Sequence, residues 1–188
     1  MKVQISDNEC IAAYEKHKNL KLAANDIGMK WQTLYVRLKK NNIAVVGDKA
    51  KYGSLADKIG AKGEKHFMSL VPDAKDQNVS KFQAPVDFDV WGVLVDVKAS
   101  LKKSSSKTTS AMRWAFSISR QVSSSDFFVF FAYDAEGVLV EKVFLIPTEM
   151  VSHLQTISIS TAGGSKWNDY EVESSELAPF FSEIGSPL

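Results

Sequence analysis

The feature that most constrains this fold is an alternating stretch from residue 86 to residue 100. Its first part places apolar side chains on one face of a β-strand and Asp87 and Asp89 on the other. A turn at Trp91 and Gly92 follows, and residues 93–98 again alternate with period two. The sequence therefore predicts a β-hairpin with one apolar and one polar face.

The polar face of this hairpin carries ionisable groups. If the two strands pair, we expect Asp89, Asp96 and Lys98 to converge at its edge. Two carboxylates and an ammonium group at the rim of an apolar sheet are costly unless something binds between them. A hard divalent cation with a phosphate suits such a group. The alternative is a surface hairpin with an incidental ion pair.

Asp89, Asp96 and Lys98 resemble the split D…(D/E)xK signature of the PD-(D/E)XK nuclease superfamily, which includes restriction endonucleases and archaeal-type Holliday junction resolvases. Ala99 and Ser100 after the lysine are also similar to that group.

This resemblance implies a catalytic metal site. Asp89, Asp96 and the carbonyl of Val97 would ligate Mg²⁺, for which Mn²⁺ would substitute, and Lys98 would orient the attacking water. In the resembled superfamily an acid on the first helix of the core completes the site, which assigns Glu64 on a predicted helix over 55–71. An exposed helix glutamate is the other reading of Glu64.

Residues 1–45 are predicted to form a small all-α module. A capping box at Ser6 and Glu9 begins a helix over about 7–18, and a short helix, a turn at Gly28 and a second helix over 30–40 follow. This segment resembles the Fis-type helix-turn-helix family, which implies that the second helix enters the major groove. Its predicted DNA contacts are Lys30, Gln32, Thr33, Arg37 and Lys40.

Two points about this module stay open. Trp31 could contact a sugar or a thymine methyl group, but we expect it to pack inside the module. A three-helix module that serves only protein contacts is the alternative to DNA binding.

Residues 46–54 are predicted to be a linker, and residues 55–188 the nuclease core. The segment 101–110 is basic and rich in hydroxyl groups, and would lie over the DNA backbone. The stretch that begins at Arg113 and Trp114 resembles one that follows the catalytic lysine in phage and mobile-element nucleases. Predicted DNA contacts in the core are Lys102, Lys103, Arg113, Arg120 and Gln121.

The core is predicted to be α/β. Residues 126–133 are continuously apolar after Asp126, which is typical of a strand buried on both faces, and residues 138–146 predict its return. The resemblance places a helix between the hairpin and this strand. The fold class that follows is a restriction-endonuclease-like mixed central sheet flanked by helices, preceded by the all-α module.

Charge is unevenly distributed along the 188 residues, although the net charge is only +1. Residues 1–66 carry 13 Lys/Arg against 7 Asp/Glu, whereas residues 121–188 carry 2 against 10. A basic front would orient the molecule on a polyanion, whereas the acidic end could simply aid solubility.

One cysteine excludes a disulfide framework, and no apolar run approaches a membrane span, so we expect a cytoplasmic protein without a membrane partner.

The two resemblances together imply a Mg²⁺-dependent endonuclease that cleaves double-stranded DNA at sites chosen by the helix-turn-helix. A phage or mobile-element role such as homing fits by analogy, in which case the location is the host cytoplasm. A Holliday junction resolvase and a non-catalytic DNA-binding regulator are the alternatives. A homodimer or higher homo-oligomer is expected, because cutting both strands with one metal site per chain generally needs two chains.

Overall fold

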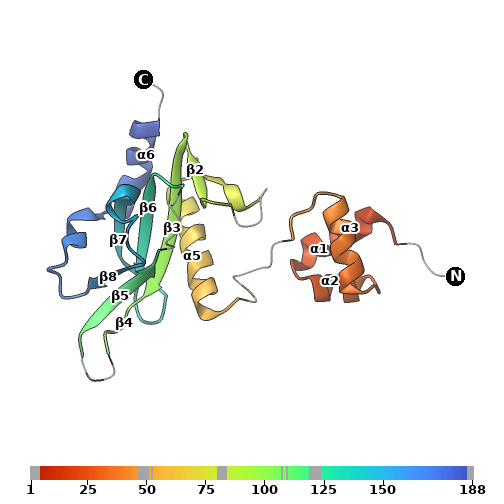
Figure 1. The fold of residues 1–188 in the computed structure, drawn as a ribbon, viewed down its shortest axis with the longest axis horizontal. Helices are drawn as coiled ribbons and strands as arrows, with labels where there is room; N and C mark the ends of the chain where they lie inside the picture. Colours follow the sequence, from red (N-terminus) through yellow and green to blue (C-terminus); the bar gives the residue numbers. More distant parts are fainter. Residues whose placement is uncertain are drawn as a thin grey trace.

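The computed structural model describes residues 5–45, 51, 53–79, 84–106, 108, 110–118 and 124–185 of the chain. Near the N-terminus, helices α1 (Asp7–His17), α2 (Leu20–Asp26) and α3 (Trp31–Lys40) form a small bundle (Figure 1). The predicted capping box of Ser6 and Glu9 is present, and Gly28 turns the chain with a φ of 66°. The predicted order of helices and turn is therefore confirmed.

The bundle has a hydrophobic cluster of its own. Ala23 and Ala24 of α2 are completely or almost completely buried, and they pack against α1 and α3 in one cluster. Small side chains allow the helix backbones to approach closely. The buried members of this cluster are Cys10, Ala13, Tyr14, Ala23, Ala24, Leu34 and Leu38.

The rest of the chain is built on a mixed sheet. Its strands are β1 (Lys75–Asp76), β2 (Phe88–Val90), β3 (Val93–Leu101), β6 (Phe127–Tyr133), β7 (Val140–Pro147) and β9 (Glu171–Val172), in the order β1-β2-β3-β6-β7-β9. Only β3 and β6 pair in parallel among these described strands, and the other neighbours are antiparallel. The predicted α/β class with a mixed central sheet is confirmed.

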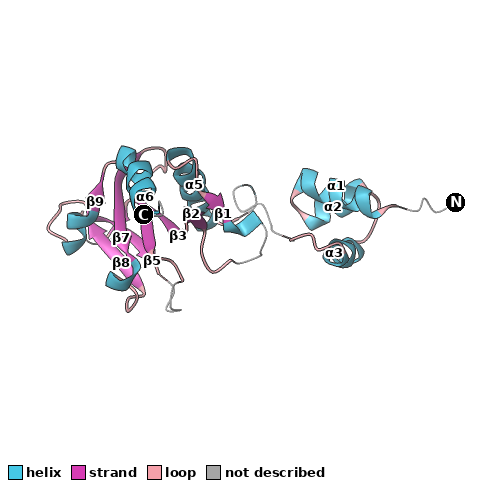
Figure 2. Cartoon of the chain, turned by 90° about the horizontal axis from the view of Figure 1, so that it is seen from above, coloured by secondary structure: helices cyan, strands magenta, loops and turns pink. Residues whose placement is uncertain are grey.

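Helices cover one face of this sheet and a second sheet covers the other (Figure 2). Helices α5 (Leu55–Leu70) and α6 (Leu177–Gly185) pack on the first face. On the second face lies a three-stranded sheet of β4 (Lys103–Ser104), β5 (Met112–Ser117) and β8 (Thr156–Ser160). The short 3₁₀ helices are η1 (Gln77–Val79), η2 (Thr148–Met150), η3 (Lys166–Tyr170) and η4 (Ser174–Glu176).

Strand β6 lies between these two layers, as its continuous apolar run predicts. Val129 and Phe131 face the helices, and Phe128 and Phe130 face the second sheet. All four side chains are at most 1% exposed. Burial of both faces explains why this strand lacks the alternation of a half-exposed one.

The nuclease resemblance predicts a helix between the hairpin and β6. This prediction was wrong for the described residues between these two elements. Residues 112–117 form β5, in which Trp114 and Phe116 are buried while Ser117 is exposed. This period-two alternation lets the aromatic side chains pack on the central sheet, where the ring of Phe116 lies 4.8 Å from that of Phe130. A helix would scatter these side chains around its axis.

His66 on α5 provides a test of the packing between this helix and β6. Its ring stacks on Phe131 at 5.0 Å, and its Nδ1 lies 3.4 Å from the hydroxyl of Tyr133. Burial, and secondarily the charge of Lys62, lowers the pKa of His66. The unfolded chain therefore binds a proton more readily, so stability is lost as pH falls through the ordinary histidine range near 6.5.

We expect His66→Phe, which keeps an aromatic ring against Phe131, to flatten the decrease of Tm between about pH 7 and pH 5. Thermal unfolding across this range measures it. His153→Phe, at an exposed histidine, is the matched control. Equal pH slopes for wild type and His66→Phe would show that His66 does not contribute to the pH dependence.

Candidate active site on the β2–β3 hairpin

The predicted hairpin is formed by β2 and β3. Trp91 and Gly92 join the strands, and both have positive φ angles, 55° and 87°, as a type I′ turn requires. This two-residue turn pairs Val90 with Val93 and Phe88 with Val95. All of these apolar side chains except the partly buried Val93 are at most 1% exposed, so the predicted apolar face of the hairpin is confirmed.

Asp87 is the carboxylate that the structure brings beside Asp96. The β2–β3 ladder ends at the pair of Phe88 with Val95, so the next opposed pair along the strands is Asp87 with Asp96. The Asp87 Oδ2 accepts a hydrogen bond from the backbone N–H of Val97 at 2.8 Å. A side chain therefore takes the place of a backbone acceptor, and the ladder opens at this point.

Asp89, the acid chosen from the sequence, does not take this position. It lies opposite Leu94, and its Oδ1 accepts the backbone N–H of Gly92 at 2.8 Å. The expected convergence of Asp89 with Asp96 and Lys98 was therefore wrong. Asp87, two residues before Asp89, takes that position instead. The missed signal was the turn: a two-residue loop at 91–92 determines the register, and counting back from it pairs residue 87 with residue 96.

Asp96 and Lys98 form an ion pair on the same face of β3. The Lys98 Nζ lies 2.7 Å from the Asp96 Oδ1, and their side chains are 31% and 16% exposed. Burial, and next the hydrogen bond with Asp87, raises the pKa of Asp96 to about 7, while Lys98 opposes this shift. Burial beside a second carboxylate therefore disfavours the charged form of Asp96, and Lys98 only partly offsets this effect.

Glu64 is not grouped with these acids. The preceding residue, Gly63, packs against the face of β3 that carries Val97 and Ala99, with only 2.9 Å between an ideal Cβ at Gly63 and the Cβ of Ala99. Side chains alternate along a strand, so Asp96 and Lys98 lie on the opposite face from α5. Within the described ranges, no group of three or more His, Cys, Asp or Glu side chains could hold a metal ion. The three carboxylates expected from the sequence are therefore not found as one group among the described residues.

The predicted DNA contacts of α3 have different surroundings. Lys30, Gln32, Thr33 and Lys40 are exposed, as DNA contacts must be. Arg37 instead fastens α3 to the start of α1: it donates to the carbonyl oxygen of Ile5 at 2.5 Å and lies 3.5 Å from Asp7. Its assignment as an outward donor was therefore wrong.

Two aromatic residues and one apolar residue of α3 are exposed. Trp31 is 42% exposed, so the expectation that it packs inside the module was wrong, and Tyr35 and Val36 are 40% and 50% exposed. Leu34 and Leu38 fill the buried side of this helix, and residues one to two positions away point outward. Helical spacing from Leu34 was the signal for Val36.

The predicted DNA contacts of the core also differ among themselves. Lys102 forms an ion pair with Glu141, whereas Lys103 on β4 is exposed. Arg113 is half-buried on β5 and donates to the Ser158 hydroxyl at 3.4 Å. Arg120 and Gln121 lie outside the described residues, so their predicted roles are not tested.

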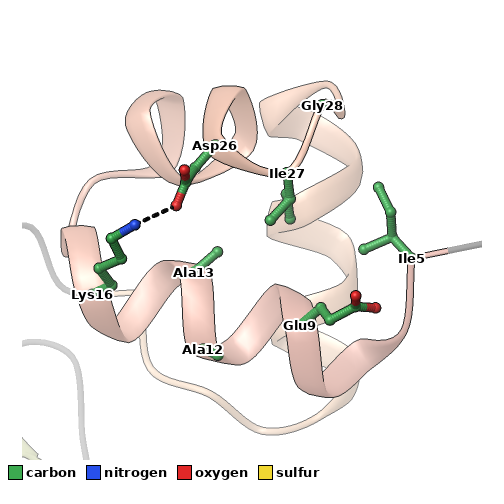
Figure 3. A pocket seen from close by; sticks show the side chains of 8 residues that line it. All are labelled: Ile5, Glu9, Ala12, Ala13, Lys16, Asp26, Ile27 and Gly28. Carbon is green, nitrogen blue, oxygen red and sulfur yellow. Dashed lines mark hydrogen bonds and ion pairs between the residues drawn. The ribbon is translucent and has the colours of Figure 1, made fainter. Parts of the chain in front are cut away.

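A large hollow in the protein lies away from the acidic group. It is an open depression on the helical module, lined mainly by apolar side chains from α1 and the turn after α2, with an ion pair of 2.9 Å between Lys16 and Asp26 at its rim (Figure 3). Ala12 and Ala13 of α1 are among its lining residues. This lining offers little chemistry, and Asp87, Asp96 and Lys98 are the better candidates for a reactive site.

Comparisons with known proteins complete this description. No helix among the described residues is both long and apolar enough to span a bilayer. No protein-family model matches the chain, and no curated protein matches it. Among solved structures, the fold is similar to that of a bacterial homing endonuclease, I-Ssp6803I, at 19% sequence identity and a TM-score of 0.45, over 66% of this chain and 90% of that one.

Proposed function

We propose that this protein is a metal-dependent DNA endonuclease whose reactive group is Asp87, Asp96 and Lys98. The observation that carries the proposal is the placement of two carboxylates and one lysine where the β2–β3 ladder opens. Such a cluster is expensive in a protein that uses it only for stability, because like charges meet in a partly buried place. A carboxyl group whose pKa is raised by burial and by a specific charged neighbour, as that of Asp96 is, is a candidate for a functional site.

The donor set fits a hard cation. Asp87 and Asp96 offer carboxylate oxygens, and the carbonyl of Val97 is a third candidate oxygen on the same strand. Mg²⁺ favours such oxygens and usually keeps several waters, so two carboxylates suffice when a phosphate supplies further ligands. When bound, the ion would supply positive charge against the phosphate oxygens of the substrate.

The protein's own side chains would position the water, the phosphate and the cation. Lys98, held by Asp96 at 2.7 Å, presents an ammonium group that can donate to a water and to a phosphate oxygen at once. Asp87 is held by the N–H of Val97 and lies beside Asp96, so a cation bound by both acids would have a defined position. Positioning of this kind supplies much of the rate enhancement in phosphate chemistry.

Site selection would come from the N-terminal bundle. The exposed Lys30, Gln32, Thr33 and Lys40 on and beside α3 are donors suited to base edges and phosphates. Each chain has one reactive group, so cleavage of both strands would use two chains in a homodimer or higher oligomer. A role in homing would follow if the protein recognises a long DNA sequence and therefore cuts DNA at few sites.

Incubation of the full chain with supercoiled plasmid tests the proposal. We expect Mg²⁺ or Mn²⁺ to support conversion to nicked or linear DNA, and EDTA to stop it. A linear duplex library and a four-way junction should be tested in parallel, because preference for the junction would favour a resolvase. DNA binding without cleavage under either metal would instead identify a regulator.

A further inference from the structure

The outer face of the small sheet differs chemically from the rest of the protein. The cross-strand pairs on this face are Arg113 with Ser160, Ala115 with Ser158, and Ser117 with Thr156. The alternating residues point the other way and are buried, as the exposed fractions of at most 1% for Trp114 and Phe116 show. The outer face thus carries hydroxyl groups beside an arginine, and Lys103 on β4 lies opposite that arginine in the strand register.

Acidic residues are missing from both sequence segments that build this sheet. The chain contains 22 Asp and Glu, yet none occurs in residues 97–125 or 150–168. These segments include β4, β5 and β8. A face that has positive charge and hydroxyl donors but no carboxylate complements a polyanion, and it opposes binding of a basic protein surface.

The small sheet contacts the central sheet close to the proposed reactive group. Ser100 lies on the same face of β3 as Asp96 and Lys98, and its Oγ accepts the backbone N–H of Ala115 in β5 at 3.0 Å. Two residues along a strand span about 7 Å, so β5 begins to cover the central sheet close to Lys98. Helices α5 and α6 lie on the opposite side (Figure 2).

The dimensions of this face suit a duplex. Five residues of β8 span about 17 Å, which is the length of about five base pairs, and a pair of strands is narrow enough for the major groove. Arg113 is also weakly held: it donates to the Ser158 hydroxyl over a long 3.4 Å, and its buried Nε has no hydrogen-bond partner among the described residues. A phosphate or a base acceptor could therefore attract this guanidinium at low cost.

We propose that the outer face of the β4–β5–β8 sheet is a second DNA-docking surface, which reads the duplex beside the scissile phosphate through Arg113 and the hydroxyl groups of β5 and β8. This inference rests on the proposed endonuclease function and adds to it a specificity surface on the core itself. Recognition would then be divided between α3 and the small sheet.

Site-specific crosslinking tests this surface. Ser158→Cys places one exposed thiol on the face, and the single native cysteine, Cys10, is only 1% exposed, so a photoreactive label should attach selectively at position 158. Ser175→Cys, at an exposed position in η4 next to α6, is the matched control. We expect a mixed-sequence 30-base-pair duplex to crosslink at position 158 at least about five times more than at position 175.

A charge variant gives an independent measurement. Thr156→Asp introduces a carboxylate at an exposed position away from Arg113, and we expect it to weaken binding of the same duplex at least about tenfold, with less than twofold change for Ser175→Asp. Both variants should keep the wild-type Tm. The inference would be overturned if the labels at positions 158 and 175 crosslinked equally and if Thr156→Asp and Ser175→Asp bound the duplex equally well. If the protein still bound and cleaved DNA, the proposed function would stay intact. Failure of the unmodified protein to bind any duplex would overturn both.

Discussion

Asp87→Asn is expected to reduce metal-dependent DNA cleavage by at least about 10³-fold, whereas Asp89→Asn is expected to change it by less than about threefold. Asp87 lies against Asp96 and accepts the N–H of Val97, so its loss removes one of two acidic ligands from the proposed metal site. Asp89 accepts the N–H of Gly92 in the turn, and its replacement should cost only about 1 kcal/mol of stability.

Single-turnover cleavage of plasmid DNA in Mg²⁺ measures both variants, with Tm and duplex affinity as controls for folding and binding. Neither variant should lose DNA affinity, because neither acid donates to a phosphate. If Asp89→Asn were inactive and Asp87→Asn active, the reactive group would have to be assigned to the turn of the hairpin instead of its open end.

Lys98→Met is the second variant with a large expected effect. Its side chain has a similar length and no charge, so it removes the ammonium that lies 2.7 Å from Asp96 while filling much of the same space. We expect the single-turnover cleavage rate to fall about 10²- to 10³-fold, which is the usual cost of losing one well-placed donor to a developing charge.

Binding of Mn²⁺ separates this loss from a loss of the metal. The cation repels Lys98 and is attracted by the two acids, so Lys98→Met should bind Mn²⁺ at least as tightly as wild type. Lys142→Met is the control, since that lysine pairs with Glu171 on β9, far along the sheet order from β3. Cleavage at more than a tenth of the wild-type rate would show that Lys98 has no chemical role.

A period-two pattern in the sequence was sufficient to predict the hairpin, and a continuous apolar run was sufficient to predict the buried strand β6. The pattern requires only that one face of a strand be apolar, or that both be, and these are local properties of residues 86–98 and 126–133. The same rule would have shown β5 as a strand, because Trp114 and Phe116 alternate with Arg113 and Ala115. The nuclease resemblance predicts a helix there instead.

Other errors arose from contacts between distant parts of the chain. Arg37 looks like an outward donor on α3, but it reaches the carbonyl of Ile5, which is 32 residues away. Glu64 is a suitable acid on a suitable helix, yet the close packing of Gly63 on Ala99 places α5 on the other face of β3. Neither contact leaves a periodic signal in the sequence.

Anomalous diffraction from a crystal of the full chain grown with duplex DNA and soaked in Mn²⁺ is the most direct test of the reactive group. We expect a peak between the carboxylates of Asp87 and Asp96, with Lys98 directed at the phosphate beside it. A peak at Asp89, or an occupied Mn²⁺ site that touches neither Asp87 nor Asp96, would contradict it.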